Sequence, residues 1–362
     1  MQVFTKFLLL TLLWSLVAAE PSAAQTTSQK QWQNERSPAY RFPRMPREGP
    51  VPFLPGSRAA ITKRTASTAR DSNTTLIGRW IGGACYRVAV AGTKAYFGNG
   101  LYLMIADVSD PGKPTELGRV LLPGIGNTTV SGNLAYVATG ADGLRIIDVS
   151  DPTNPTEVGF LVTGGWVSDV AVSEKYAYLA VYGEGLRIID VSDPTNPIEV
   201  GITEDDYLAN DVALSGDHAY VADEIIGGLR IIDVSNPAKP FEVGFFKTYT
   251  PAFTDIPFDL AVRGNFVYVA DQNNGVRIIN VSDPANPTEV GFFDTEGSCW
   301  GVAVSGDFVY VADGIRGLRI IFVAIPASPI EVGFFDTAGL AGNVAVSGNY
   351  AYVADNTSIS IQ

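Results

Sequence analysis

The stretch LRIIDVSDPTNPTEVGF at residues 144–160 decides the fold, because close copies of it return along the chain. LRIIDVSDPTNPIEVG follows at 186–201, and further copies begin at residues 229, 276 and 318. A divergent copy, LMIADVSDPGKPTELGRV, occupies residues 103–120. Equivalent positions lie 41, 42, 43, 47 and 42 residues apart. A repeat length in the low forties is typical of solenoids and β-propellers.

Each copy resolves into four short predicted strands. In the fourth copy these are residues 211–215, 219–223, 229–234 and 241–246. They are rich in Val, Ile, Tyr and Phe, and residues typical of turns bound each of them. Prolines fall between the strands, where they remove no hydrogen bond from a sheet. Four antiparallel strands in a repeat of this length predict a propeller blade, and hence an all-β fold.

The two ends of the repeated region complement each other. Six copies are complete, whereas the last residues, 344–362, supply only three strands of a seventh. The sequence TTLIGRW at 74–80 matches the missing fourth strand, which reads TELGRV or TEVGF elsewhere. We therefore expect a seven-bladed β-propeller over residues 75–362, closed by pairing the N-terminal strand with the C-terminal blade.

The phrase LRIIDVSDPxxPxEVG resembles the LVIVD repeat, which defines a family of exported bacterial and archaeal propeller proteins. The resemblance covers residues 75–362 and is intact in copies two to five. The first copy departs from it at Met104 and Ala106, and the sixth carries Phe322 and Ile325 in place of aspartates. The resemblance implies a propeller fold and export. It implies no mechanism, because the family has no established catalytic set.

The N-terminal region predicts export. Residues 1–24 read as a signal peptide, with Lys6 before an apolar run at 7–18 and small residues at 22–24. That run is shorter than the roughly 20 residues that span a bilayer, so we expect no transmembrane anchor. Residues 25–74 are rich in Pro, Ser, Thr and Arg, which predicts a disordered basic linker. The mature protein is predicted to be secreted, into the extracellular or periplasmic space.

The charge is distributed unevenly. Residues 1–74 hold ten Lys and Arg against four Asp and Glu, a net charge of +6. Since the whole chain carries −13, residues 75–362 carry −19. Such an acidic body repels phosphate backbones, so nucleic acid is not an expected partner. We expect a protein or glycan partner at the cell exterior, and a monomeric chain.

One repeat position, at the start of the first strand of each blade, differs from blade to blade. It is occupied by Arg87, Asn127, Asp169, Asp211, Asp259, Gly301 and Asn343. Aromatic residues lie just before it or in the same connections: Tyr86, Phe258, Trp300, Trp166 and Tyr207. One interpretation is a polar, aromatic-rimmed ligand site at the mouth of the central channel. The other is that the Asp and Asn side chains bond backbone N–H groups of a neighbouring blade, as buried polar groups normally do.

Three functions are compatible with these residues. The first is a non-catalytic extracellular binding module. The second is a metal-dependent hydrolase of the propeller-lactonase type, in which channel aspartates would hold calcium, the one cofactor considered. The third is a structural component of the cell surface. Catalysis is the less expected, because His218 is the only histidine and the chain lacks the residue sets of triads and ordinary zinc sites.

Residues repeated in every blade are expected to serve the blade itself. The arginines of the third strand should lie opposite the glutamates of the fourth, and the aspartates before each Pro should close local turns. Cys85 and Cys299 fall at the same position of blades one and six, with blade seven between them. A disulfide requires Cα atoms within about 7 Å, so both thiols are predicted to be free.

Overall fold

The computed structural model describes residues 74–80, 85, 87–203, 207–224, 227–248, 257–337, 339–356 and 359–361. The predicted signal peptide and the predicted linker up to residue 73 lie outside these residues, and so does Tyr86. The described residues form strands, bridges, turns and bends, which confirms the all-β prediction. Within the described part of the chain, no helix is long and apolar enough to cross a membrane.

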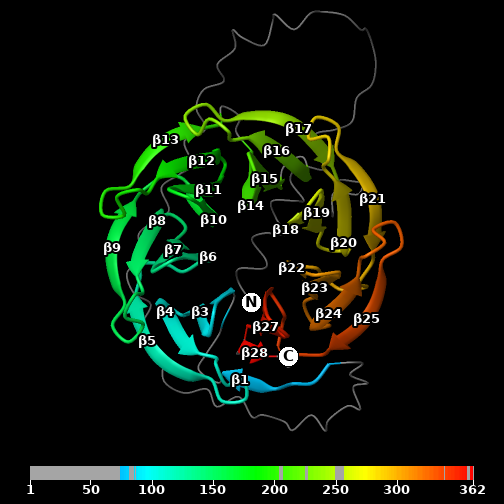
Figure 1. The fold of residues 1–362 in the computed structure, drawn as a ribbon, viewed down its shortest axis with the longest axis horizontal. Helices are drawn as coiled ribbons and strands as arrows, with labels where there is room; N and C mark the ends of the chain where they lie inside the picture. The colour runs from blue at the N-terminus through cyan, green and yellow to red at the C-terminus, as the bar shows by residue number, and fades with distance from the viewer. Residues whose placement is uncertain are drawn as a thin grey trace, which may run out of the picture. The chain divides into compact units, whose positions relative to one another are not determined.

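The strands described here form seven four-stranded antiparallel sheets, arranged as a β-propeller (Figure 1). The first strands, nearest the centre, are β2 Val88–Ala91, β6 Thr128–Ser131, β10 Trp166–Ser173, β14 Ala209–Ser215, β18 Asp259–Arg263, β22 Gly301–Ser305 and β26 Asn343–Ser347. The second strands are β3 Lys94–Asn99, β7 Leu134–Ala138, β11 Tyr176–Tyr182, β15 His218–Asp223, β19 Phe266–Ala270, β23 Phe308–Ala312 and β27 Tyr350–Ala354.

The outer half of each sheet consists of a third and a fourth strand. The third strands are β4 Tyr102–Asp107, β8 Leu144–Asp148, β12 Gly185–Asp190, β16 Gly228–Asp233, β20 Val276–Asn280, β24 Leu318–Phe322 and β28 Ile359–Ile361. The fourth strands, at the rim, are β5 Thr115–Leu121, β9 Thr156–Leu161, β13 Ile198–Ile202, β17 Phe241–Lys247, β21 Thr288–Phe293, β25 Ile330–Phe335 and β1 Gly78–Trp80. The strands predicted for the fourth copy agree with β14 to β17 to within two residues.

The first strand of the chain and the last belong to one sheet. Its order is β1-β28-β27-β26, and β1 pairs antiparallel with β28, with Gly78 opposite Ile361 and Trp80 opposite Ile359. The pairing is shorter than the 74–80 segment that the sequence suggested. Upstream of β1, the Thr74 hydroxyl donates a hydrogen bond to the carbonyl oxygen of Phe334 in β25, 2.5 Å away.

The first strands contact one another in cyclic order. Contacts run from β2 to β6, β10, β14, β18, β22 and β26, and β26 in turn contacts β2. The residues at the start of these strands, which the sequence had singled out, are therefore gathered around the centre of the propeller.

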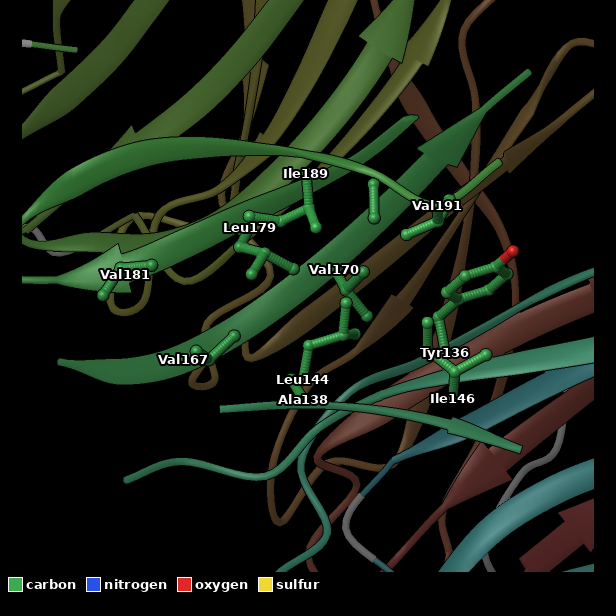
Figure 2. Close-up of a cluster of buried hydrophobic side chains, with 11 residues drawn as sticks. Tyr136, Ala138, Leu144, Ile146, Val167, Val170, Leu179, Val181, Ile189 and Val191 are labelled. Atoms are coloured by element: carbon green, nitrogen blue, oxygen red, sulfur yellow. The ribbon is translucent and has the colours of Figure 1, made fainter. Parts of the chain in front are cut away.

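The hydrophobic core lies between neighbouring sheets. Figure 2 shows one layer, in which Tyr136, Leu144 and Ile146 of one sheet pack against Val170 and Leu179 of the next. Alternate residues of the second and third strands face opposite neighbours, so both faces of these strands are buried. This explains why the AYVA and LRII segments are apolar almost throughout, without the alternation of a half-exposed strand.

The repeated phrase also forms the outer joint between sheets. In the fourth strand, the glycine of EVG packs against the carbonyl oxygen of the first proline in the turn between the third and fourth strands of the next sheet. A Cβ at Gly201 would lie 1.9 Å from the Pro237 oxygen, and a Cβ at Gly159 would lie 2.0 Å from the Pro194 oxygen. The same contact joins Gly78 of β1 to Pro111, again at 1.9 Å. Only glycine fits this close approach of two backbones.

Candidate functional site

The variable position lies where the sequence analysis placed it, at the start of the first strands. Asp169, Asp211, Asp259 and Asn343 are all buried, with 3 to 6% of their surface exposed. Arg87, which immediately precedes β2, is half-buried, and so is Asn127 before β6. The six polar side chains therefore line the central channel mostly out of contact with bulk water.

Four of these side chains bond the backbone of the following sheet. Asp169 Oδ2 accepts from the N–H of Val212 at 2.9 Å, and Asp211 Oδ2 from Leu260 at 2.7 Å. The same bonds join Asp259 Oδ2 to the N–H of Val302 at 2.9 Å and Asn343 Oδ1 to that of Val88 at 3.0 Å. These bonds confirm the second interpretation of the sequence, in which the polar side chains tie neighbouring blades together. Whether the same residues also bind a ligand stays a prediction.

The other positions depart from this pattern for local reasons. Gly301 has no side chain to donate or accept, and a Cβ there would lie 2.8 Å from the Cα of Asn343. Asn127 Oδ1 accepts from the N–H of its own neighbour, Thr128, at 3.3 Å. In that sheet the link to the next one is made by Thr129, whose hydroxyl donates to the carbonyl oxygen of Val170 at 2.7 Å.

The three aspartates also interact with each other. Asp211 lies between Asp169 and Asp259 and hydrogen-bonds both carboxyl groups. Burial raises the pKa of Asp211 well above its usual range, and the two neighbouring carboxylates raise it further, although Arg87 opposes the shift. Burial also raises the pKa of Asp259, against the influence of Arg87 and of the Val302 N–H. Asp211 is therefore the member of the group that most readily holds a proton.

Metal ligation was one predicted use of these aspartates. Among the residues that the structure describes, no group of three or more His, Cys, Asp or Glu is arranged to hold a metal ion. The Oδ2 atom of each of the three aspartates already accepts a backbone hydrogen bond. Binding of calcium stays a prediction for experiment.

The aromatic residues of the connections have different environments. Phe258 and Trp300 contact each other, with ring centroids 4.6 Å apart, and Trp300 is 36% exposed. Trp166 is far more exposed, at 60%. Tyr207, in contrast, is fully buried beneath the guanidinium of Arg230, so it belongs to the core and not to the rim.

The repeated charged residues form ion pairs within the five sheets that carry both of them, as predicted, but with an offset. Arg145 Nη1 lies 3.1 Å from Glu157, and Arg277 Nη1 lies 2.8 Å from Glu289. The partners are not directly opposite, because a bulge in each pair of strands shifts the register and places Phe160 opposite Arg145. The arginine therefore reaches diagonally to the glutamate while its guanidinium lies 4.7 Å from the Phe160 ring centroid.

The predicted turns are also present. The N–H of Ser150 donates to Asp148 at 2.8 Å, and the N–H of Thr153 donates to Asp151 at 3.0 Å. The hydroxyls of Ser150 and Thr153 bond the same two carboxyl groups, and these side-chain bonds, together with the N–H bonds, lower the pKa of both. The carboxyl groups of the Asp-rich turn are therefore already bonded to backbone N–H groups of the same turn.

The two cysteines are buried and carry free thiols. Cys85 Sγ donates to the carbonyl oxygen of Arg87 at 3.2 Å, and burial raises the pKa of the Cys85 thiol to about 12. Burial raises the pKa of Cys299 as well. Neither has the lowered pKa of a catalytic cysteine. His218 lies in a tight hairpin at the end of the propeller opposite to the aromatic residues, half-buried beside Tyr220.

A cluster that the sequence did not single out lies near Trp166. The Tyr182 hydroxyl hydrogen-bonds the carboxyl group of Glu224, which also bonds the side chain of Asn210. Glu224 lies one residue beyond the end of β15, outside the strands that the repeat predicts, so the spacing of the repeat did not mark it. The one available signal was that Tyr182 stands where the other copies carry Gly, Glu, Gln or Asn.

Comparisons with known proteins support the fold and the family. The designed protein Ika8 shares 9% sequence identity, with a TM-score of 0.58 and coverage of 78% of this chain and 99% of its own. The Cps50 (Swd1) β-propeller domain of Myceliophteria thermophila shares 14%, with a TM-score of 0.66 and coverage of 79% and 98%. These likenesses concern the fold alone. The search of curated proteins gave no match.

The repeats themselves identify the family. The LVIVD repeat matches seven successive segments: residues 82–121, 126–163, 164–205, 208–248, 258–295, 296–337 and 338–361. Their boundaries follow the sheets described above, each segment beginning shortly before a first strand. The chain belongs to the LVIVD repeat family.

Proposed function

We propose that the seven sheets are the blades of one closed ring, and that this ring is a non-catalytic binding module acting outside the cytoplasm. Three contacts support closure of the ring: the pairing of β1 with β28, the contact of β26 with β2, and the packing of Gly78 on Pro111. The last of these repeats the joint found between the other blades. The propeller then has two ends and no open seam at which sheets could add.

The two ends of the propeller differ in character. We call the end where first strands begin and second strands finish the loop face, and the opposite end, with its repeated DP turns, the turn face. The loop face presents exposed apolar side chains: Trp166 at 60%, Ile315 at 79%, Leu340 at 47%, Tyr182 at 39% and Trp300 at 36%. This exposure of two Trp and one Tyr is the observation that carries the proposal, since such residues dominate binding surfaces.

The polar side chains at the start of the first strands, which we call the polar ring, fit a structural role beneath this face. Its three aspartates and Asn343 accept hydrogen bonds from backbone N–H groups of neighbouring blades. These bonds make the channel mouth a rigid support. Phe258 and Trp300 stand at its edge, so a ligand centred on the loop face would contact them. His218 lies on the turn face, away from the polar ring and from the exposed aromatic residues of the loop face.

Export is the second half of the proposal. The predicted signal peptide supports secretion, and the acidic body with its exposed aromatic residues suits a protein or glycan partner at the cell exterior. A structural role at the cell surface would use the same face, because attachment also requires a binding surface.

The test is retention on cell envelopes isolated from the cells that export the protein. The purified, exported chain should sediment with the envelopes, and the double substitution Trp166→Ala/Trp300→Ala should reduce the bound fraction about tenfold or more, as for loss of two hot-spot residues. The matched control is Phe241→Ala/Ile325→Ala, which removes exposed apolar side chains of 57 and 62% exposure from the turn face. Equal retention of the two variants would refute the loop face as the binding surface.

A further inference from the structure

The indole of Trp166 is held rigidly while much of it remains open to solvent. Its six-membered ring lies against the backbone of the preceding blade, since a Cβ at Gly140 would be 2.9 Å from its Cη2 and Cζ2 atoms. Gly140 also forms a two-way backbone bridge with Val167, the next residue, at 3.0 and 3.2 Å. Val167 is a core residue (Figure 2). Trp166 therefore presents a flat apolar surface that loses little entropy when a ligand covers it.

A second aromatic ring and a polar cluster stand beside it. Trp166 is directly opposite Tyr182 in the β10–β11 pair, so both side chains leave the sheet on the same face. The Tyr182 hydroxyl bonds Glu224, and Glu224 bonds Asn210, which in turn donates to the carbonyl oxygen of Pro257 at 3.3 Å. The cluster thus combines an apolar platform with hydroxyl, carboxyl and amide groups that are already oriented.

The backbone fixes these groups relative to one another. The bridge from Tyr182 to Leu208 joins blades three and four, and the N–H of Glu224 donates to the Leu208 carbonyl oxygen at 3.0 Å. Asn210 lies at the bulge between Ala209 and Asp211, which turns its side chain out of the regular alternation. All of these residues are therefore held by strands and bridges of the propeller.

The charges of the cluster are already balanced, which selects the class of ligand. Glu184, beside the Gly165–Trp166 backbone, forms an ion pair with Arg187. Glu224 is half-buried and accepts bonds from Tyr182 and Asn210, while burial raises the pKa of its carboxyl group and so disfavours the charged form. Among the described residues of the cluster, Glu184 and Glu224 are both bonded to partners already, so neither offers a free carboxylate to a cationic ligand, and the acidic body repels an anionic one.

We propose that Trp166, Tyr182, Glu224 and Asn210 form a binding site for the pyranose rings of a neutral oligosaccharide. A pyranose offers a face of C–H groups that packs on an indole, and hydroxyls at its edge that both donate to carboxyl oxygens and accept from amide N–H groups. The inference rests on the proposed binding function and names its ligand class. The site lies on blade three, with the Trp166 indole against Gly140 of blade two and with Glu224 and Asn210 in blade four, apart from the channel mouth that the sequence had indicated.

The test uses the exported chain and four neutral probes: cellohexaose, chitohexaose, maltohexaose and laminarihexaose. Isothermal titration calorimetry should detect binding of at least one, with quenching of tryptophan fluorescence. Trp166→Ala should weaken that binding by about thirtyfold or more, the effect of losing a hot-spot aromatic. Tyr182→Phe, which keeps the ring but removes the bond to Glu224, should weaken it roughly tenfold.

The matched control is Phe241→Ala, which removes an exposed aromatic ring from the turn face, outside the proposed binding surface, and should bind the oligosaccharide as the unaltered chain does. A thermal melt of each variant checks that it is folded. Absence of binding by all four probes, or unchanged binding by Trp166→Ala, overturns the inference, as does binding of choline with the same dependence on Trp166. If the chain sediments with envelopes yet binds no probe, the proposed function stands and the carbohydrate site falls.

Discussion

Closure of the ring can be tested by the substitution Gly78→Ala, which replaces one hydrogen atom of Gly78 by a methyl group. In Gly78→Ala the new Cβ would lie 1.9 Å from the carbonyl oxygen of Pro111 and 2.9 Å from its carbon, whereas ordinary contacts begin near 3.4 Å. The two backbones must therefore separate by about 1.5 Å, an overpacking that typically costs about 1–3 kcal/mol. Replacing a strand glycine without such a clash would instead stabilise the protein by about 0.4–1 kcal/mol through the unfolded chain.

The assay is a thermal melt of three variants. For domains of this size, 1 kcal/mol corresponds to roughly 2–4 °C, so Gly78→Ala should lower the Tm by roughly 2–12 °C. Gly201→Ala creates the same clash with Pro237 in the middle of the chain and should lower it as much. Gly98→Ala is the control, because its Cβ would meet side-chain atoms of Ile125, Cγ2 at 2.8 Å and Cβ at 3.4 Å, and no backbone carbonyl of another blade, so it should lower the Tm less. If Gly78→Ala melts like Gly98→Ala while Gly201→Ala is destabilised, β1 is not held against the first blade and the closed ring is wrong.

Four further predictions concern the polar ring and the thiols. Asp259→Ala leaves the buried N–H of Val302 unpaired and should cost about 1–3 kcal/mol in a denaturant titration, whereas Asp259→Asn keeps an acceptor and should cost clearly less; equal losses would exclude the bond as the cause. Because the pKa of Asp211 is raised in the folded state, its stabilising contribution is complete below the unfolded pKa and is lost as pH rises through the folded one. The Tm of Asp211→Asn relative to the unaltered chain should therefore increase from pH 4 to pH 8, and a constant difference would contradict the shift. Millimolar calcium and EDTA should give the same Tm, since the aspartates' Oδ2 atoms are already bonded; a higher Tm in calcium would favour the metal-dependent alternative. Cys85 and Cys299 should resist a thiol reagent in the folded protein and both react in guanidinium without reductant, and failure to react when unfolded would reveal a disulfide.

The fold could be predicted because each blade repeats its own turn and strand signals. In the fourth copy the Pro-bearing turn, the SGDH turn and the apolar segments between them fixed four strands to within two residues. The Asx turns followed from Asp before Pro for the same local reason. Contacts between blades were harder to foresee. The glycine of EVG was read as part of a strand, yet it is glycine because a proline carbonyl of the next blade occupies the space of its Cβ.

The ion pairs show where local rules fail. The spacing of Arg145 and Glu157 predicted a directly opposed pair, but the pair is diagonal because a bulge lies between Ile146 and Ile147. No sequence signal marks that bulge. Tyr207 was grouped with the rim aromatics from its place in a connection, although its side chain is buried. Both errors concern the path of the backbone between elements, which hydrophobic pattern does not determine.

Variation around a ring of repeats is therefore weak evidence for a ligand site. Gly301 differs from the aspartates of its neighbours because a side chain there would meet the backbone of Asn343 and approach Asp259 Oδ2 to 3.2 Å. The aspartates differ from Asn127 because they bond the following blade and it does not. Once these joints are accounted for, the Asp and Asn residues that stood out at the channel have internal partners. Trp166 differs from them. Its indole packs against Gly140, but it is largely exposed and forms no contact that is repeated between the other blades. A ligand is expected at a side chain that forms no contact repeated in the other blades, and that criterion favours Trp166 on blade three over the mouth of the channel.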